Sequence, residues 1–302
     1  MKIIKKISER FKQSPLWFMG YFLRKFSVSR RIPDDVYIKL EYLFETGRVL
    51  KLAPPTSYNE KLQWLKLHDI HPEYTEFVDK YSAKEYVAKV VGDKYIIPTL
   101  GVWDTFEEID FIKLPNRFVL KTTNDSGGVF IVNDKNTMDI NRAKEVIKRS
   151  FNRNYFYVHR EYPYKNVCPR IIAEQFMVDE SGSELKDYKI FCFDGVPKLI
   201  QVDYDRFTEH KRNLYDIEWK RLPFTLKFPT DWNREIPKPE GLKEMLDVAS
   251  KLSKGMKHVR VDLYHINGKV YFGELTFFHG SGHEKFSPRE WDYKLGEWLK
   301  IQ

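Results

Sequence analysis

The most constraining feature of the sequence is a pair of apolar segments near its C-terminal end, separated by Asn267 and Gly268. The segments cover residues 259–265 and 270–277, and Asn-Gly favours the tight turn that joins antiparallel strands. Polar residues recur in both segments at every second position, which is the spacing of one face of a strand. We therefore expect a hairpin with one polar face and one apolar face.

The rest of the chain divides into a helical opening and a strand-rich remainder. Ser57 and Glu60 have the spacing of a capping box, and Gly92 ends the last helix expected in the opening. The expected helices cover 60–67, 79–91, 139–151 and 239–254. The expected strands cover 95–100, 117–122, 129–132, 170–178, 188–193 and 198–203, the last two joined by Asp194-Gly195.

Helices and antiparallel hairpins follow one another without regular strand-helix-strand alternation, so the expected fold class is α+β. We expect a helical lobe over residues 1–78, a first α+β lobe over 79–175 and a second over 176–302. The stretch from about 205 to 240, rich in Pro, Trp and charged residues, is expected to be a loop.

Composition limits the classes of function. The formal charge of +8 favours anionic partners such as nucleotides, acidic glycans or anionic lipid. Cys168 and Cys192 are the two cysteines and form no C-x-x-C pair, which predicts neither a disulfide framework nor a zinc motif and fits a reducing cytoplasm. The sequence has no apolar run of about 18 residues that could span a bilayer, and its N-terminus lacks the features of a signal peptide.

Residues 1–31 mix basic and apolar side chains in a pattern typical of an amphipathic helix. Such a helix could contact the inner face of a membrane peripherally. A helix packed on its own domain accounts for the pattern as well.

The polar face of the C-terminal hairpin carries Arg260, Asp262, Glu274 and Thr276. Two carboxylates that converge from neighbouring strands form a hard-oxygen site suited to Mg²⁺, and the arginine could stabilise transferring phosphate. The alternative is a solvated face whose charges pair across the strands. The many apolar neighbours argue against it, because a buried carboxylate needs a partner or a metal.

A second candidate site is a strand that ends in Lys121 and is followed by Ser126, Gly127 and Gly128. Backbone N–H groups of such a turn, together with the lysine, could bind polyphosphate. An ordinary hairpin turn with a surface lysine is the alternative, and the segment has no Walker A pattern.

From about Pro54 to the C-terminus, the order of these pieces resembles the ATP-grasp fold, and more narrowly the TupA-like (teichuronopeptide-biosynthesis) ATP-grasp family. The segments that carry the resemblance are Ser57-Tyr58-Asn59-Glu60-Lys61 with Trp64, Asp79-Lys80-Tyr81, 118–121, Ile171-Ile172-Ala173-Glu174-Gln175, Asp187-Tyr188-Lys189, 259–264 and Phe272-Gly273-Glu274-Leu275-Thr276.

The resemblance implies ATP and Mg²⁺ as cofactors, bound between two lobes. Lys80 and Lys121 would touch the nucleotide phosphates, under a loop formed by Ser126, Gly127 and Gly128. The remaining implied nucleotide contacts are a hinge of Glu174, Gln175 and Phe176 beside adenine, and Asp187 or Lys189 near ribose or phosphate. The alternative for Glu174 is a charge on an edge strand.

The resemblance also implies the metal ligands and the catalytic groups. Asp262 and Glu274 match the magnesium carboxylates, and Thr276 stands where many relatives place an asparagine. Arg260 and Lys121 would be the catalytic residues. The segment from His279 to His283 (HGSGH) would supply a phosphate or acceptor loop; as a zinc tract it lacks a third ligand at zinc spacing.

The implied reaction joins a carboxylate to an amine through an acylphosphate. The expected substrates are a uronic acid of a surface-polysaccharide precursor and an amino acid or small amine. Arg206, Lys211 and Arg212, close in sequence to Tyr204 and Phe207, could hold an acidic sugar, although surface solvation accounts for them equally well.

Two other classes of function remain open. A glycosyltransferase could use the same carboxylates for a metal-bound nucleotide sugar, and would release UDP instead of ADP. A basic protein that binds nucleic acid would show affinity that falls steeply with salt and survives loss of both carboxylates. We expect no nucleic-acid partner.

Overall fold

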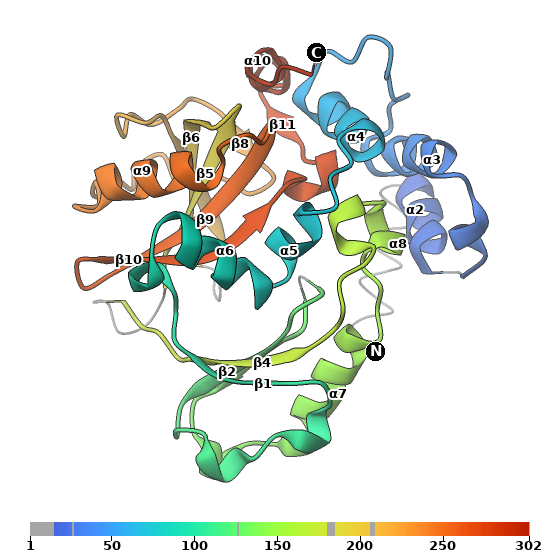
Figure 1. Cartoon of the computed structure of the whole chain (residues 1–302). Coiled ribbons are helices and arrows are strands. Elements are labelled where there is room, and N and C mark those ends of the chain that lie inside the picture. The colour runs from blue at the N-terminus through green and yellow to red at the C-terminus, as the bar shows by residue number, and fades with distance from the viewer. Residues whose placement is uncertain (1–14, 26, 126, 180–184, 206–208, 302) are drawn as a thin grey trace.

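The structure is a computed structural model that describes residues 15–25, 27–125, 127–179, 185–205 and 209–301. Two antiparallel sheets lie one above the other in Figure 1, and helices cover their outer sides. The first sheet has the strand order β1-β4-β2-β3, the second β10-β9-β5-β6-β7, and a small third sheet is β11-β8. The strands are β1 (Thr99–Trp103), β2 (Phe118–Thr122), β3 (Val129–Val132), β4 (Ile171–Gln175), β5 (Asp187–Phe193), β6 (Val196–Tyr204), β7 (Lys211–Tyr215), β8 (Thr225–Leu226), β9 (His258–Ile266), β10 (Lys269–Thr276) and β11 (Phe286–Ser287).

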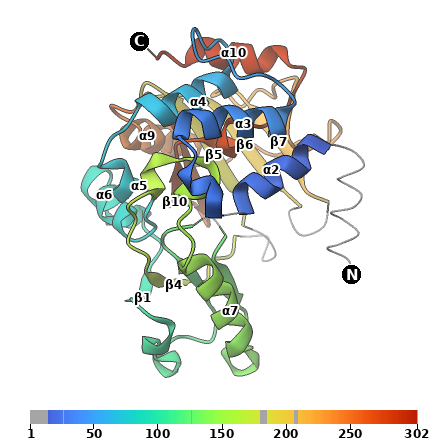
Figure 2. The same ribbon diagram turned by 90° about the vertical axis from the view of Figure 1, so that its right-hand side faces the viewer.

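Helices lie around the sheets and also between them, where α5 and α6 stand between β10 and the first sheet (Figures 1 and 2). α7 lies beside the first sheet, α9 lies on the second, and α2 and α3 stand together at the N-terminal side. The helices are α2 (Pro15–Lys25), α3 (Asp34–Thr46), α4 (Tyr58–His68), α5 (Tyr74–Val78), α6 (Ser82–Val90), α7 (Ile140–Phe151), α8 (Phe156–His159), α9 (Leu242–Leu252) and α10 (Glu290–Trp298). The 3₁₀ turns are η1 (Ser27–Arg31), η2 (Asp93–Tyr95), η3 (Phe106–Glu108), η4 (Phe111–Lys113), η5 (Lys135–Thr137), η6 (Tyr162–Tyr164) and η7 (His279–Gly282).

The first sheet packs one face against α7. Phe118 and Leu120 of β2 share a buried apolar cluster with Ala143 and Ile147 of α7. Alternation along β2 then turns Val119 and Lys121 to the opposite face. That face is the one that lies toward the second sheet in Figure 1.

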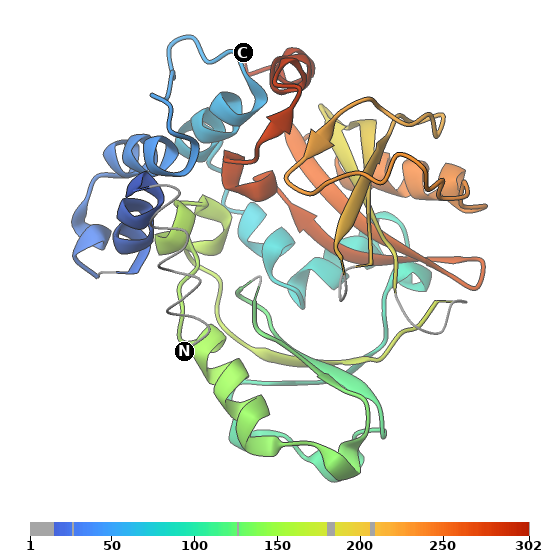
Figure 3. The ribbon, with the colours of Figure 1, turned by 180° about the vertical axis from the view of Figure 1, so that it is seen from behind.

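The second sheet packs one face against α9. Ile190 of β5 pairs with Val261 of β9, and both are buried in one cluster with Met245 and Ala249 of α9. Figure 3 shows the sheet from behind, with β6, β7 and the segment that carries β8 on this side of the molecule. Because neighbours along a strand alternate, the residues between these apolar ones form a separate, polar face.

Most of the predicted elements are confirmed. Ser57 accepts a hydrogen bond from the Glu60 N–H and the Glu60 carboxylate bonds back to the Ser57 N–H, which completes the predicted capping box of α4. Asn267 and Gly268 both have positive φ, as the predicted tight turn requires. Two details were wrong: the strand expected over 95–100 begins only at Thr99, and the expected loop of 205–240 contains β7 and β8.

The helical opening does not form one packing unit. Tyr58 and Leu62 of α4, and Ala83 and Val87 of α6, belong to the apolar cluster of the second sheet. Ile38 of α3 packs in a separate small cluster. Buried apolar residues between 58 and 95 pack largely on the second sheet. The domain limits expected at 78/79 and 175/176 stay predictions.

The amphipathic N-terminal segment lies partly outside the described residues, which begin at 15. Its described part, α2, packs against α3, as the intramolecular interpretation requires. In the described part of the chain, no helix combines the length and the apolarity needed to cross a bilayer.

Candidate functional site

Three charged residues stand side by side on the polar face of the second sheet. Lys189 of β5 pairs with Asp262 of β9, which in turn pairs with Glu274 of β10. The pairing of Asp262 with Glu274 depends on a β-bulge at Gly273, where the register shifts by one residue. The predicted shared face of the two carboxylates is therefore confirmed.

Asp262 is the buried centre of this group. Only 2% of the residue is exposed. Arg260 donates to both of its carboxylate oxygens, from Nε to Oδ1 at 2.6 Å and from Nη2 to Oδ2 at 2.7 Å. Lys189 Nζ lies 2.5 Å from Oδ2 and 3.2 Å from Asp187 Oδ2. Asp262 is therefore not solvated as the alternative interpretation expects, although its charge does pair across the strands, with Lys189 of β5.

Glu274 and Thr276 occupy the more open side of the group. The Glu274 side chain is 42% exposed, and its Oε1 accepts from Arg260 Nη2 at 3.2 Å. The Thr276 hydroxyl lies 3.0 Å from Arg260 Nη2 and 3.3 Å from Glu274 Oε1. The side chains of Asp262, Glu274 and Thr276 thus place two carboxylates and one hydroxyl around one arginine.

The face of the first sheet opposite α7 carries a complementary set of lysines. Glu174 on β4 is 5% exposed, and Lys84 and Lys121 place their ammonium groups 2.6 Å and 2.5 Å from its two carboxylate oxygens. Burial opposes ionisation of Glu174, but the two lysines lower its pKa. β4 lies between β1 and β2, so the interpretation of Glu174 as an edge-strand charge is wrong.

Lys80 approaches the same face from the segment before α6. Its ammonium group donates to the backbone carbonyl of Asp125. Burial lowers the pKa of Lys80, and the negative charge of Glu274 opposes this effect. The ammonium group of Lys80 therefore interacts electrostatically with a carboxylate of the second sheet.

The electrostatic environment of Glu274 combines both sheets. Partial burial of the Glu274 carboxyl raises its pKa, but cationic neighbours outweigh this effect, and the net pKa is lowered. Those cations are Arg260, Lys189, Lys80 and Lys121. The predicted metal residue and both predicted phosphate lysines are thus close enough to interact.

In the predicted phosphate loop, the backbone of Gly128 packs closely against the side chains of Thr122 and Ser150. A Cβ on Gly128 would lie 2.2 Å from Thr122 Oγ1 and 2.5 Å from Ser150 Oγ, so only glycine fits there. A Cβ on Gly127 would find its nearest neighbour, Asp125 Oδ2, at 3.8 Å. Ser126 lies outside the described residues.

The predicted hinge follows the end of β4. The Gln175 N–H donates to the carbonyl of Pro98 at 3.0 Å, and the Phe176 ring stacks under the Arg117 guanidinium at 4.1 Å. These contacts position the backbone that leads from the first sheet to the second.

The HGSGH segment splits into two environments. His279 Nδ1 lies 2.6 Å from Arg260 Nη1, and its Nε2 lies 3.2 Å from Glu284 Oε2, which ties this end to the carboxylate group. His283 points elsewhere, toward Glu41. The two histidines therefore do not form one metal tract.

The predicted sugar-binding residues are not free side chains where they are described. Arg212 is 5% exposed and is held by Asp203 at 2.7 Å and by Glu284 at 3.3 Å. Lys211 pairs with Glu209 at 2.8 Å. The surface-solvation interpretation is wrong for Arg212, which is buried, and the sugar-binding interpretation stays a prediction. Arg206 and Phe207 lie outside the described residues.

Sequence reasoning missed Lys84 and the pair of Asp203 and Arg212. Lys84 lies within a predicted helix, and nothing in its spacing shows that it reaches Glu174 from another element. Asp203 of β6 lies opposite Asp187 of β5. The sequence signal for it was that Gln201 and Asp203, two residues apart on a predicted strand, share one polar face.

The donor set fits a hard divalent ion. Mg²⁺ takes oxygen ligands, commonly one or two carboxylates, and leaves its other positions to water and phosphate oxygens. Asp262, Glu274 and Thr276 could hold such an ion, because their oxygens converge on Arg260 and the Glu274 side chain is partly open to solvent.

Comparison with known proteins finds one matching family and several similar solved structures. The profile of the family described as TupA-like ATPgrasp matches residues 60–300. No curated protein matches the chain. Similar solved structures include a D-alanine--D-alanine ligase from Bacillus anthracis complexed with ATP, with 17% identity, 74% of this chain and 57% of that chain covered, and a TM-score of 0.41.

Two further structures show the same level of similarity. The ATP-grasp ligase PsnB, complexed with minimal precursor, Mg and ADP, has 11% identity, 80% and 64% coverage and a TM-score of 0.41. D-alanyl-alanine synthetase A from Vibrio cholerae O1 biovar eltor has 12% identity, 73% and 63% coverage and a TM-score of 0.42. The chain thus spans about three fifths of the length of these proteins.

Proposed function

The chain belongs to the TupA-like ATP-grasp family, and from this premise we propose that it is an ATP-dependent carboxylate-amine ligase. One observation carries the proposal. A pair of directly opposed carboxylates on the second sheet, Asp262 and Glu274, lies within electrostatic reach of Lys80, which precedes α6, and of Lys121 on β2.

The proposed roles follow from charge. Asp262, Glu274 and Thr276 would hold Mg²⁺, whose charge offsets the repulsion between ATP and a carboxylate substrate. Lys80 and Lys121 would bind the nucleotide phosphates, with the backbone of residues 126–128 beside them. Arg260 would stabilise the negative charge that develops on the transferred phosphoryl group.

The nucleotide base would lie against the hinge. We propose that backbone groups of Glu174, Gln175 and Phe176 read the adenine edge, with Asp187 or Lys189 near ribose or phosphate. The Glu174 side chain has a second role, because it holds Lys84 and Lys121 in place.

The reaction has two steps. A substrate carboxylate oxygen attacks the γ-phosphorus of ATP, and the bond to ADP breaks, which gives an acylphosphate. The amine nitrogen then attacks the acyl carbon, phosphate leaves with the bonding electrons, and the amine loses a proton to give the amide. We propose a uronic acid of a cytoplasmic polysaccharide precursor as the carboxylate and an amino acid or small amine as the nucleophile.

Trapping with hydroxylamine tests this proposal. Wild-type protein, Mg-ATP and a panel of uronic acids, free and nucleotide-linked, should yield ADP and a hydroxamate in equal amounts, because hydroxylamine intercepts an acylphosphate. Glu274→Gln should yield neither product. ADP release without hydroxamate would contradict carboxylate activation, and release of UDP without ATP would support a glycosyltransferase.

A further inference from the structure

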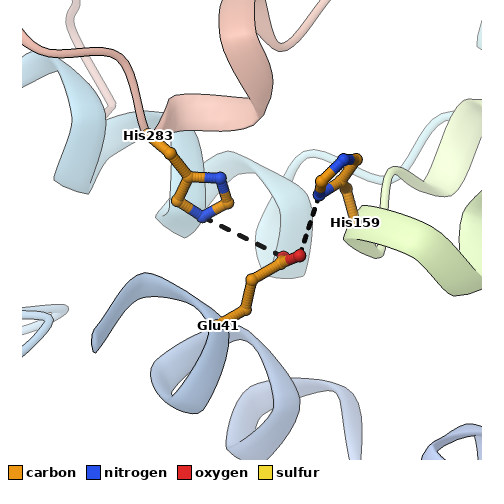
Figure 4. A group of neighbouring side chains, drawn as sticks. All are labelled: Glu41, His159 and His283. Carbon is orange, nitrogen blue, oxygen red and sulfur yellow. Dashed lines mark hydrogen bonds and ion pairs between the residues drawn. The ribbon is translucent and has the colours of Figure 1, made fainter. Parts of the chain in front are cut away.

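A buried group of three potential metal ligands lies away from the two sheets. Glu41 of α3, His159 of α8 and His283 after η7 point toward one another in Figure 4. Their ligand atoms all lie within 4.8 Å of one another. They come from three segments that are more than a hundred residues apart in the sequence, so tertiary structure alone assembles the group.

The hydrogen bonding of this group is incomplete. His159 Nδ1 lies 2.8 Å from Glu41 Oε1, which is a normal hydrogen bond. His283 Nε2 lies 3.9 Å from Glu41 Oε2, and among the described residues neither of these two buried atoms has a hydrogen-bond partner. Buried polar atoms without partners are uncommon in folded proteins, and a bound ion is one way in which such atoms are satisfied.

The gap between these atoms has the size of a bound ion. Two zinc-ligand bonds laid end to end span about 4.1 Å, and ligands of a tetrahedral zinc lie about 3.3 Å apart. The observed 3.9 Å falls between these values, and because no two ligand atoms of the group lie more than 4.8 Å apart, the side chains need to close by at most about 1.5 Å. Two imidazoles and one carboxylate are a common zinc set that leaves a fourth position for water.

The nearby cations have other partners. Arg24 Nη1 lies 3.5 Å from Glu41 Oε1, but it makes a shorter contact with Glu45. Lys66 donates to the carbonyl of Ser281 at 2.9 Å.

We propose that Glu41, His159 and His283 bind one Zn²⁺ ion, which links α3 and α8 to the HGSGH segment. The Glu41 side chain is fully buried, and those of His283 and His159 are 8% and 21% exposed, which suits a structural ion. The ion positions residues 279–283, whose other end contacts Arg260 through His279. The ion is not a reactant, and the proposal does not depend on the ligase activity.

Zinc binding to full-length, chelator-treated protein tests the proposal. Competition with a chromophoric chelator should give one zinc per chain in wild type. His159→Gln and Glu41→Gln should each weaken binding at least 100-fold, while His68→Gln, which alters an exposed histidine of α4, should bind as wild type does. His159 is the most exposed of the three ligands, so its variant is the one that best preserves the fold.

Thermal unfolding supplies a second readout. Zinc at 100 times its Kd should raise the Tm of wild type and His68→Gln by roughly 5 °C, and should not raise the Tm of the ligand variants. Equal zinc binding by wild type, Glu41→Gln and His159→Gln would overturn the proposal, as would the absence of stoichiometric binding in wild type.

Discussion

The two sheets carry opposite excesses of charge on their polar faces. Facing the first sheet, Lys121 of β2 and Lys84 of α6 share the buried carboxylate of Glu174, and Lys80 lies nearby with a backbone carbonyl as its hydrogen-bond partner. On the second sheet, the carboxylates of Asp187, Asp262 and Glu274 share Lys189 and Arg260.

The difference matches the two halves of a metal-nucleotide complex. A phosphate chain is attracted to surplus lysines, and a divalent cation to surplus carboxylates. In each group, residues of opposite charge compensate the buried charges, so the protein can fold without the ligand. An isolated buried charge would be costly in free energy. We call Lys80, Lys84 and Lys121 the basic set, and Asp187, Asp262 and Glu274 the acidic set. Substitutions in the two sets should therefore impair different properties of the protein.

The largest expected effect is loss of turnover when the acidic set is weakened. Glu274→Gln should lower ATP turnover at least about 100-fold, because a bound metal supplies several kcal/mol of charge stabilisation and each 1.36 kcal/mol is a factor of ten. Coupled-enzyme detection of ADP measures it. The side chain is 42% exposed, so the fold should persist.

Asp262→Asn extends this prediction to the buried carboxylate. It should lose turnover at least as completely, and circular dichroism should show the wild-type spectrum. Turnover at the wild-type rate in either variant would remove the acidic set from the mechanism.

A smaller effect is expected when the basic set is weakened. Lys121→Ala removes one charge-assisted contact to phosphate, worth about 1.5–3 kcal/mol, so the Kd for ATP should rise about tenfold to a hundredfold. Titration calorimetry measures this change. Lys113→Ala is the control, because this lysine is exposed and pairs with Asp110 and not with a residue of the site; the variant should bind ATP as tightly as wild type does.

The smallest expected effect concerns the backbone of the phosphate loop. Gly128→Ala places a methyl group against Thr122 and Ser150 and should lower the free energy of unfolding by about 1–3 kcal/mol. Gly127→Ala has room for its methyl group and should change this free energy by less than about 0.5 kcal/mol. Chemical denaturation compares the two, and equal losses would show that close packing at Gly128 is unimportant.

Local patterns predicted much of the fold. The capping box at Ser57 and the turn at Asn267 and Gly268 depend on residues close in sequence, and both are confirmed. β7 and β8 were missed because short strands at the rim of a sheet are defined by their partners more than by their own composition.

The shared face of Asp262 and Glu274 was predicted for an incomplete reason. The tight turn alone sets a register that places Phe272 opposite Leu263, and continued without interruption it would place Glu274 opposite Val261. The bulge at Gly273 moves Glu274 opposite Asp262 and onto the same face. An isolated glycine within a strand pattern was the available signal.

The group of Glu41, His159 and His283 could not be predicted from spacing. Zinc motifs are recognised in a sequence when their ligands are close along the chain, and the HGSGH segment has no third ligand at zinc spacing. Only the packing of α3 and α8 against the HGSGH segment supplies the other two side chains.

The central claim is that the second sheet binds the metal and the first sheet binds the phosphates. Calorimetric titration with ATP, with and without Mg²⁺, tests it in three proteins. Magnesium should tighten ATP binding to wild type and to Lys121→Ala, although the latter binds more weakly throughout. In Glu274→Gln, the affinity should be the same with and without magnesium. An undiminished magnesium effect in Glu274→Gln would contradict the account.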